Sequence, residues 1–204
     1  MPPTRNGQPR RRFPAEILTD AEVCRLLDAC GRRPTGVRSR ALIAILYRSG
    51  LRINEALDLF PKDVDLESGA IRILNGKGGQ ARTVGIDPAA GAFVERWLVV
   101  RSELGMNGTC PVFCTLARGR TGDAYVRVLL PRLGRMAGIG KGIHAHGFRH
   151  THDARLRAEG VDIGIISKQL GHRTIATTAR YLDHIAPYAV IEAMHCRVWQ
   201  RLNV

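Results

Sequence analysis

The stretch VDLESGAIRILNGKGGQARTVGID, residues 64–87, decides the fold class of this chain, because the hydrophobic pattern changes there. Two turn clusters, ESG and NGKGG, separate short β-type runs, of which residues 70–74 and 81–86 are the clearest. The spacing predicts a small antiparallel sheet of two or three strands, with Lys77 in its tightest turn.

Helical patterns lie on both sides of this sheet. The first helix is expected from LTDAEVCRLLDAC, where Thr19 is placed to cap it and Glu22 follows three residues later. Further helices are expected over 37–49, in a short run before Pro61, from Pro88 onward with Phe93, Trp97 and Val100 at helical spacing, over 123–137, 147–159, 162–170 and 175–182, and after Pro187, with Gly50, Gly160 and Gly171 as helix ends and 105–122 as a loop. These patterns predict a mainly α protein with a small antiparallel β-sheet.

The chain of 204 residues has room for one domain with its own core. Residues 1–14, MPPTRNGQPRRRFP, are rich in Pro and Arg and are expected to form a disordered basic arm before a domain over 15–204. The N-terminus lacks the apolar core of a signal peptide, and the longest apolar run, residues 41–47, is too short to span a bilayer. We therefore expect a cytoplasmic protein without membrane contact.

The chain is strongly basic, with 31 Lys and Arg against 18 Asp and Glu and a net charge of +13. Most of this charge is arginine, whose fork matches phosphate geometry, so nucleic acid is the favoured partner class. A GC-rich genome, which also raises arginine content, is the ordinary alternative. The five cysteines are odd in number and have no repeated pair spacing, so they are expected to be reduced thiols. Cys110 and Cys114 could form half of a metal site, but no second Cys/His pair of matching spacing follows.

Four short strings hold the unusual polar residues: GLRINEAL with Arg52, NGKGG with Lys77, HAHGFRHTHD with His146 and Arg149, and LGHRTIATTARY with His172 and Tyr181. Singly, each has an ordinary explanation, such as a salt bridge from Arg52 to Glu55 or a tyrosine packed in the core. Together they meet the needs of phosphoryl transfer from DNA: a nucleophile, stabilisation of charge on the non-bridging oxygens, and a proton for the leaving oxygen.

Tyr181 is the candidate nucleophile. A phenol has a pKa of about 10, so it needs help in losing its proton, which His146 and the surrounding positive charge could supply. Lys77, in its hairpin turn, is placed to protonate the leaving 5′-oxygen.

Arg52 and Arg149 offer two bidentate forks for the phosphate, and His172 can donate a further hydrogen bond to the same oxygens. The sequence shows no cluster of Asp and Glu suited to two Mg²⁺ ions, which disfavours a two-metal nuclease or transposase.

The order Arg, Lys, His-x-x-Arg, His, Tyr resembles the tyrosine recombinases, also called phage integrases. Their first box looks like GLRxxEAL, as at residues 50–57, their second is similar to H-x-L-R-H, as at 146–150, and their third to LGHxxxxTTxxY, as at 170–181. A lone H-x-x-R is a weak signal, but these boxes in this order are specific. The resemblance covers roughly residues 17–200.

This resemblance implies the family's catalytic domain, which is mainly α with a small three-stranded antiparallel sheet that carries the lysine. It implies a site-specific recombinase that cleaves and rejoins double-stranded DNA through a 3′-phosphotyrosine and a free 5′-hydroxyl, without metal or nucleotide cofactor. The residues that it implies as catalytic are Arg52, Lys77, His146, Arg149, His172 and Tyr181.

The resemblance also implies a homotetramer on paired DNA sites, with the C-terminal helix docked onto a neighbour. The candidate apolar face of that helix comprises Ile191, Met194, Val198 and Trp199. Packing of the helix against its own chain is the alternative.

Three features depart from the family's pattern. Phe148 stands where leucine is usual, which changes packing rather than charge, and Gln80 replaces a common basic residue after the lysine turn. We expect this chain to lack the N-terminal DNA-clamping domain usual in the family, and so to be a naturally short member or a fragment.

Other interpretations remain at this point. Residues 161–182 could form the two helices of a non-catalytic helix-turn-helix DNA-binding protein. A type IB topoisomerase-like enzyme would share the chemistry but only relax DNA. A zinc site in HAHGFRHTHD could use His146 and His150, although Arg149 would repel the cation.

Overall fold

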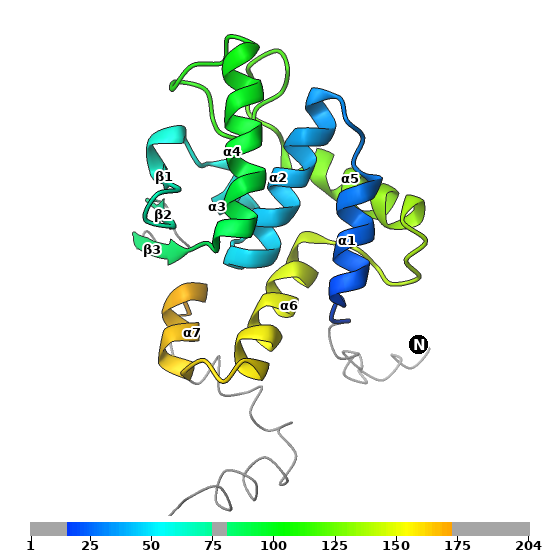
Figure 1. Ribbon diagram of the computed structural model, residues 1–204, viewed down its shortest axis with the longest axis vertical. Coiled ribbons are helices and arrows are strands. Elements are labelled where there is room, and N and C mark those ends of the chain that lie inside the picture. The colour runs from blue at the N-terminus through cyan, green and yellow to red at the C-terminus, as the bar shows by residue number, and fades with distance from the viewer. Residues whose placement is uncertain (1–15, 75–80, 173–204) are drawn as a thin grey trace, which may run out of the picture.

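The computed structural model describes residues 16–74 and 81–172 of the chain (Figure 1). The elements in these ranges are α1 (Asp20–Ala29), α2 (Pro34–Ser49), α3 (Ile53–Leu57), a short 3₁₀ turn at Pro61–Asp63, β1 (Val64–Asp65), β2 (Ala70–Ile73), β3 (Arg82–Gly85), α4 (Pro88–Glu103), α5 (Asp123–Met136), α6 (Ala145–Ala158) and α7 (Ile163–Leu170). The predicted class, mainly α with a small three-stranded antiparallel sheet, is confirmed.

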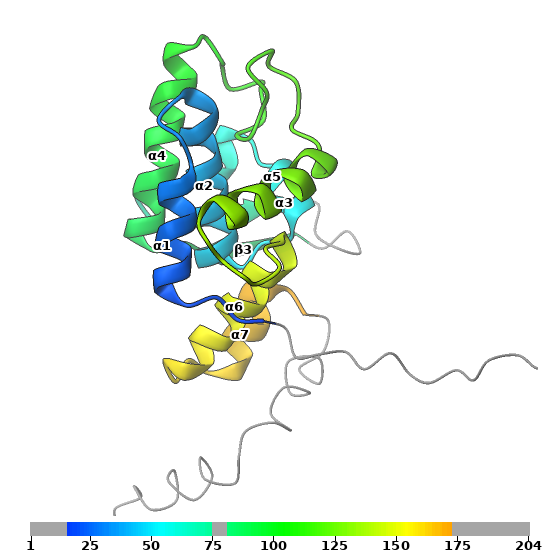
Figure 2. The same cartoon turned by 90° about the vertical axis from the view of Figure 1, so that its right-hand side faces the viewer.

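Helix α2 lies in the middle of the fold and packs along α4 and against α6 (Figure 1). Every side chain of residues 41–47 is buried, as expected for a helix that is apolar on all sides. From α4, Trp97 is fully buried, and its ring nitrogen Nε1 donates to the carbonyl of Val112 at 2.7 Å. This core leaves the C-terminal end of α2 facing α6 and α7, which Figure 2 shows at the same end of the molecule.

The predicted helix ends are largely confirmed. Thr19 and Glu22 form a capping box at the start of α1, and Gly50 and Gly171 end α2 and α7 with φ values of 62° and 61°. At Gly50 an added Cβ would come within 2.5 Å of His152 Cδ2 and 2.8 Å of Leu170 Cδ2. Glycine at this position therefore allows both the left-handed turn and the close approach of α6 and α7.

Some boundaries differ from the prediction for local reasons. Helix α2 begins three residues earlier than expected, because Pro34 takes the first helical position, where its missing N–H costs nothing. Helix α6 begins at Ala145, since the His144 ring caps it by accepting from the backbone N–H of Gly147 at 3.0 Å. Helix α3 ends at Leu57, before Pro61, which instead begins the 3₁₀ turn. On α4, the helix predicted from the spacing of Phe93, Trp97 and Val100 is present, with Trp97 fully buried and Phe93 36% exposed.

The sheet has the order β1-β2-β3, with all neighbours antiparallel. Ile71 on β2 pairs with Val64 on β1 and with Val84 on β3, and the side chains of Ile71 and Val84 enter the core. Strand β3 forms one edge of the sheet and contacts α7. The turn predicted to carry Lys77 lies outside the described residues, as do the arm 1–14 and the helices predicted for 175–182 and after Pro187.

Within residues 16–74 and 81–172, no helix is both long enough and apolar enough to cross a membrane.

Candidate active site

Arg149 lies on α6 and is only 5% exposed. Its Nη1 donates to the carbonyl of Gly50 at 2.7 Å, and its Nη2 donates to the carbonyl of Leu170. Both acceptors are at the C-terminal ends of helices, where carbonyls carry partial negative charge. Burial, followed by the charge of Arg52, lowers the pKa of Arg149 to about 10, so the group is still a cation at neutral pH. The guanidinium is thus fixed between the ends of α2 and α7.

Arg52 is the N-cap residue of α3, directly after the turn at Gly50. Its Nη1 donates to Glu55 Oε1 at 2.8 Å, and its Nη2 donates to the carbonyl of Gly171 at 3.4 Å. Its side chain keeps 30% of its surface exposed, whereas that of Glu55 keeps 4%. The ordinary salt bridge is therefore present, and it holds Arg52 beside the end of α7, next to Arg149.

Glu55 connects Arg52 to the sheet. Arg82 on β3 donates through Nη1 and Nη2 to the two carboxylate oxygens of Glu55, at 2.9 and 2.8 Å. Burial raises the pKa of Glu55, but hydrogen bonds from Arg82 and Arg52 outweigh it and bring the pKa to about 2. Sequence reasoning missed Arg82. No local pattern in the sequence relates Arg82 to Glu55, which lies 27 residues earlier in the chain.

Two of the predicted histidines belong to the same site. Burial lowers the pKa of His146 to about 4, and the charges of His150, Arg149 and Arg52 act in the same direction. Burial likewise lowers the pKa of His172 to about 4, and Arg149 is the next largest cause. Both imidazoles are neutral at pH 7, so His146 can accept a proton and His172 can donate an N–H.

The described part of the chain thus brings four predicted residues together: Arg52, His146, Arg149 and His172. Besides burial, the two arginines are close enough to both histidines to lower the histidine pKa values, and Arg52 is close enough to Arg149 to lower its pKa. Two guanidinium forks and two neutral imidazoles in such a group can bind a phosphodiester and stabilise the negative charge that grows on it in a transition state. Lys77 and Tyr181, the predicted acid and nucleophile, lie outside the described residues.

Comparison with known proteins agrees with this geometry. Residues 16–186 match the phage integrase family. The chain belongs to this family. It is 32% identical over 191 residues to the tyrosine recombinase XerC of Xanthomonas axonopodis pv. citri, an alignment that covers 92% of this chain and 60% of XerC. The chain therefore spans less than two thirds of the length of this curated relative.

Solved structures show the same fold. The crystal structure of XerA recombinase matches with a TM-score of 0.74 and 29% identity over 90% of this chain and 66% of XerA. The XerH site-specific recombinase bound to its difH substrate, in a pre-cleavage complex, matches with a TM-score of 0.73 and 27% identity over 91% of this chain and 55% of XerH. The described fold is that of the tyrosine recombinase catalytic domains.

The departure from the phage integrase pattern at Phe148 is a packing change. Its side chain is fully buried in the core, while the neighbouring Arg149 points to the helix ends. The His146 and His150 rings are in edge contact, with centroids 4.2 Å apart and planes at 74°. Among the described residues, no three His, Cys, Asp or Glu side chains are grouped to hold a metal ion.

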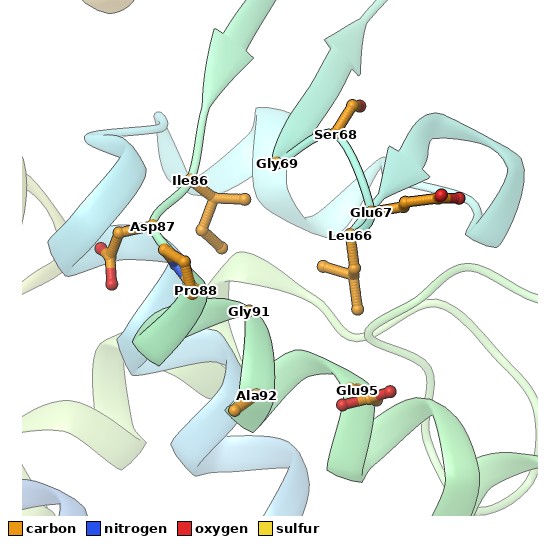
Figure 3. Close-up of a pocket in the computed structure, with 10 residues that line it drawn as sticks. All are labelled: Leu66, Glu67, Ser68, Gly69, Ile86, Asp87, Pro88, Gly91, Ala92 and Glu95. Carbon is orange, nitrogen blue, oxygen red and sulfur yellow. The ribbon is translucent and has the colours of Figure 1, made fainter.

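A separate hollow lies between the turn at residues 66–69 and the start of α4 (Figure 3). Its charged lining residues are Glu67, Asp87 and Glu95, which are all acidic. Asp87 already accepts from Arg48 Nε at 2.6 Å. This hollow would repel a phosphate, whereas the cationic site at the ends of α2 and α7 would attract one.

Proposed function

We propose that this chain is a site-specific DNA recombinase that cleaves and rejoins DNA through a covalent 3′-phosphotyrosine intermediate. The observation that carries the proposal is the pair of guanidinium groups, Arg52 and Arg149, held beside neutral His146 and His172 by carbonyls at the helix ends. Membership of the phage integrase family and the likeness to DNA-bound XerH support it.

In the proposed reaction, the phenol oxygen of Tyr181 attacks the scissile phosphorus and the bond from phosphorus to the 5′-oxygen breaks. The phenol proton passes to His146, which is neutral at pH 7. Besides burial, the charges of Arg149 and Arg52 help to keep its pKa low, so a bound phosphodiester, which offsets those charges, would make it a stronger base. Lys77 protonates the leaving 5′-oxygen. Rejoining is the reverse attack by a 5′-hydroxyl on the phosphotyrosine, which restores the protons and needs no external energy.

Arg52, Arg149 and His172 bind the non-bridging oxygens in this scheme. Because the positive charges of the two arginines help to hold the pKa of His172 low, a bound phosphate dianion or phosphodiester would raise that pKa again. DNA binding should therefore be accompanied by proton uptake.

The partner in this proposal is double-stranded DNA, in keeping with the net charge of +13. We further propose that residues 15–204 act as one catalytic domain, that the active species is a homotetramer on paired sites, and that Ile191, Met194, Val198 and Trp199 dock the C-terminal helix onto a neighbouring subunit.

A nicked duplex built from the DNA that flanks the gene tests the chemistry. Wild-type protein should form a covalent protein–DNA adduct in EDTA as well as in Mg²⁺, because the positive groups take the place of a metal. Tyr181→Phe should form none, whereas the control Tyr188→Phe should match wild type. An adduct from Tyr181→Phe would show that the nucleophile is wrong, and tight DNA binding by wild type without an adduct would favour the helix-turn-helix alternative.

A plasmid with two cognate sites separates recombination from relaxation. Exchange of the flanking segments supports a recombinase, whereas relaxation without exchanged products would support a type IB topoisomerase-like activity.

A further inference from the structure

Gly85 leaves two hydrogen-bonding groups at the open edge of the sheet. It pairs with Ala70 in the β2–β3 register, and the next residue, Ile86, donates its N–H to the carbonyl of Gly69 at 2.9 Å. This bond makes Ala70 and Gly85 a non-hydrogen-bonded antiparallel pair. The N–H and C=O of Gly85 therefore point away from β2, toward the side on which α7 lies.

The carboxamide of Gln169 on α7 satisfies both groups. Its Oε1 accepts from the N–H of Gly85 at 2.9 Å, and its Nε2 donates to the carbonyl of Gly85 at 2.9 Å. Nε2 also donates to the carbonyl of Ser49, in the last turn of α2, at 3.2 Å. One side chain thus completes the sheet edge as a neighbouring strand would, and it joins β3, α2 and α7.

The residues that follow Gln169 orient the two phosphate-binding arginines. The carbonyl of Leu170 accepts from Arg149, and the carbonyl of Gly171 accepts from Arg52. Gly171 also lies against Arg82, since an added Cβ would come within 2.7 Å of Arg82 Nε. A shift of α7 along the edge of β3 would therefore move both acceptors at once.

We propose that Gln169 is a positioning residue for the phosphate site. By fixing α7 to the edge of β3 and to the end of α2, it sets the orientation of Arg52 and Arg149 and the place of His172. The inference rests on the proposed function, in that the bound phosphate is taken to be that of DNA. A contribution of Gln169 to stability alone is the competing explanation.

Inorganic phosphate is the probe, titrated into the full chain and followed by the imidazole NMR signals of His146 and His172. Gln169→Met, which keeps the length but removes the amide, should weaken phosphate binding about fivefold, the effect of one net hydrogen bond. The control Ile165→Gln, on the same helix at a site 60% exposed, should leave the affinity unchanged. Thermal unfolding of each variant reports stability separately.

A double-mutant cycle distinguishes positioning from stability. In an Arg52→Ala background the effect of Gln169→Met should fall below about twofold, because the two residues act through one arrangement. An equal loss in both backgrounds would overturn the inference, as would wild-type affinity in Gln169→Met. Failure of the wild-type protein to bind phosphate at about 50 mM, a concentration at which only a negligible affinity would escape detection, would also overturn it. If the phosphate results hold but no DNA adduct forms, the proposed function fails and the positioning role stands.

Discussion

Helices α2 and α6 are both packed into the molecule, but they bury different kinds of side chain. Residues 41–47 of α2 are buried and mostly apolar, whereas α6 buries Arg149, Thr151, His152 and Asp153. Apolar burial has no direction, so residues 41–47 need only to be surrounded by groups of the right volume. Buried polar groups need partners, and Arg149 and Thr151 find theirs in distant segments, whereas Asp153 pairs with Arg157 one turn along α6.

The partners of α6 fix its position at several points. Arg149 bonds to Gly50 and Leu170, and Thr151 Oγ1 accepts from the N–H of Leu18 at 3.1 Å and donates to the carbonyl of Gly147 at 2.9 Å. The polar cluster, which we define as Arg52, Glu55, Arg82 and Arg149, extends this arrangement to α3 and β3. The comparison teaches that the core around α2 gives stability, while the directional bonds of α6 and the polar cluster set the geometry for chemistry.

The largest effect should come from Glu55→Gln. This change leaves Arg52 and Arg82 without the charge that both of them contact, and removal of one member of a buried ion pair typically costs about 3–5 kcal/mol. Urea denaturation measures the free energy of unfolding. The control is Asp58→Asn, one residue past the end of α3, whose pair with Arg120 is exposed and should change stability by less than about 1 kcal/mol. Equal losses of unfolding free energy in Glu55→Gln and Asp58→Asn would show that the polar cluster contributes no more to stability than an ordinary surface ion pair.

Arg149→Ala should separate chemistry from stability. Loss of a donor to the charged phosphate should slow adduct formation about a hundredfold to a thousandfold, while DNA binding is retained. Ile45→Val, a conservative change at a fully buried position of α2, should lower the free energy of unfolding by about 1 kcal/mol and leave the rate of adduct formation unchanged. Equal loss of DNA binding and cleavage in Arg149→Ala would instead assign that arginine to binding alone.

Acid should weaken the α6 region more than the core. Burial lowers the pKa of His152 to about 4, and the charges of Arg48 and Arg149 act in the same direction. The folded state therefore favours neutral His152, while the unfolded chain takes up a proton below about pH 6.5. The stabilisation is complete above pH 6.5 and is lost as the pH falls toward 4, up to about 3 kcal/mol. Urea denaturation at several pH values should show that the free energy of unfolding falls less steeply with decreasing pH in His152→Leu than in the wild type. Parallel pH profiles for the two proteins would show that His152 is not the origin of the acid sensitivity.

The smallest expected difference between a variant and its control, about 1–3 kcal/mol, concerns the junction of α2 with α6 and α7. Gly50→Ala and Gly138→Ala both place an alanine at positive φ, but only at Gly50 would the new Cβ meet His152 and Leu170. The strain of positive φ should cost both variants about 1–2 kcal/mol, and the clash should cost Gly50→Ala about 1–3 kcal/mol more. Equal decreases in the melting temperatures of the two variants would show that α6 and α7 can move away from α2 without loss of stability.

The sequence predicted the parts of the fold that depend on neighbouring residues. Local bonds and backbone angles mark the helix ends: α1 begins at the capping box of Thr19 and Glu22, α4 begins at Pro88, and α2 and α7 end at Gly50 and Gly171. The two turn clusters likewise mark the sheet. The start of α6 was wrong because a histidine, an uncommon cap, holds its first turn.

Tertiary bonds were beyond local patterns. Arg82 and Glu55 are 27 residues apart, and Gln169 and Gly85 are 84 apart, so no spacing rule relates them. The grouping of the two arginines with His146 and His172 could be predicted, because the order of the motifs along the chain indicates which residues share a site. Lys77 and Tyr181 remain predictions.

The most direct test of the central claim is to identify the amino acid that carries the DNA. The adduct formed with the nicked duplex is digested with nuclease and trypsin, and the modified peptide is sequenced by mass spectrometry. Cleavage after Arg180 and Arg197 gives the peptide YLDHIAPYAVIEAMHCR, in which fragment ions distinguish Tyr181 from Tyr188. The account predicts a nucleotide phosphate on Tyr181, and a phosphate on Tyr188 or on a residue outside this peptide would contradict it.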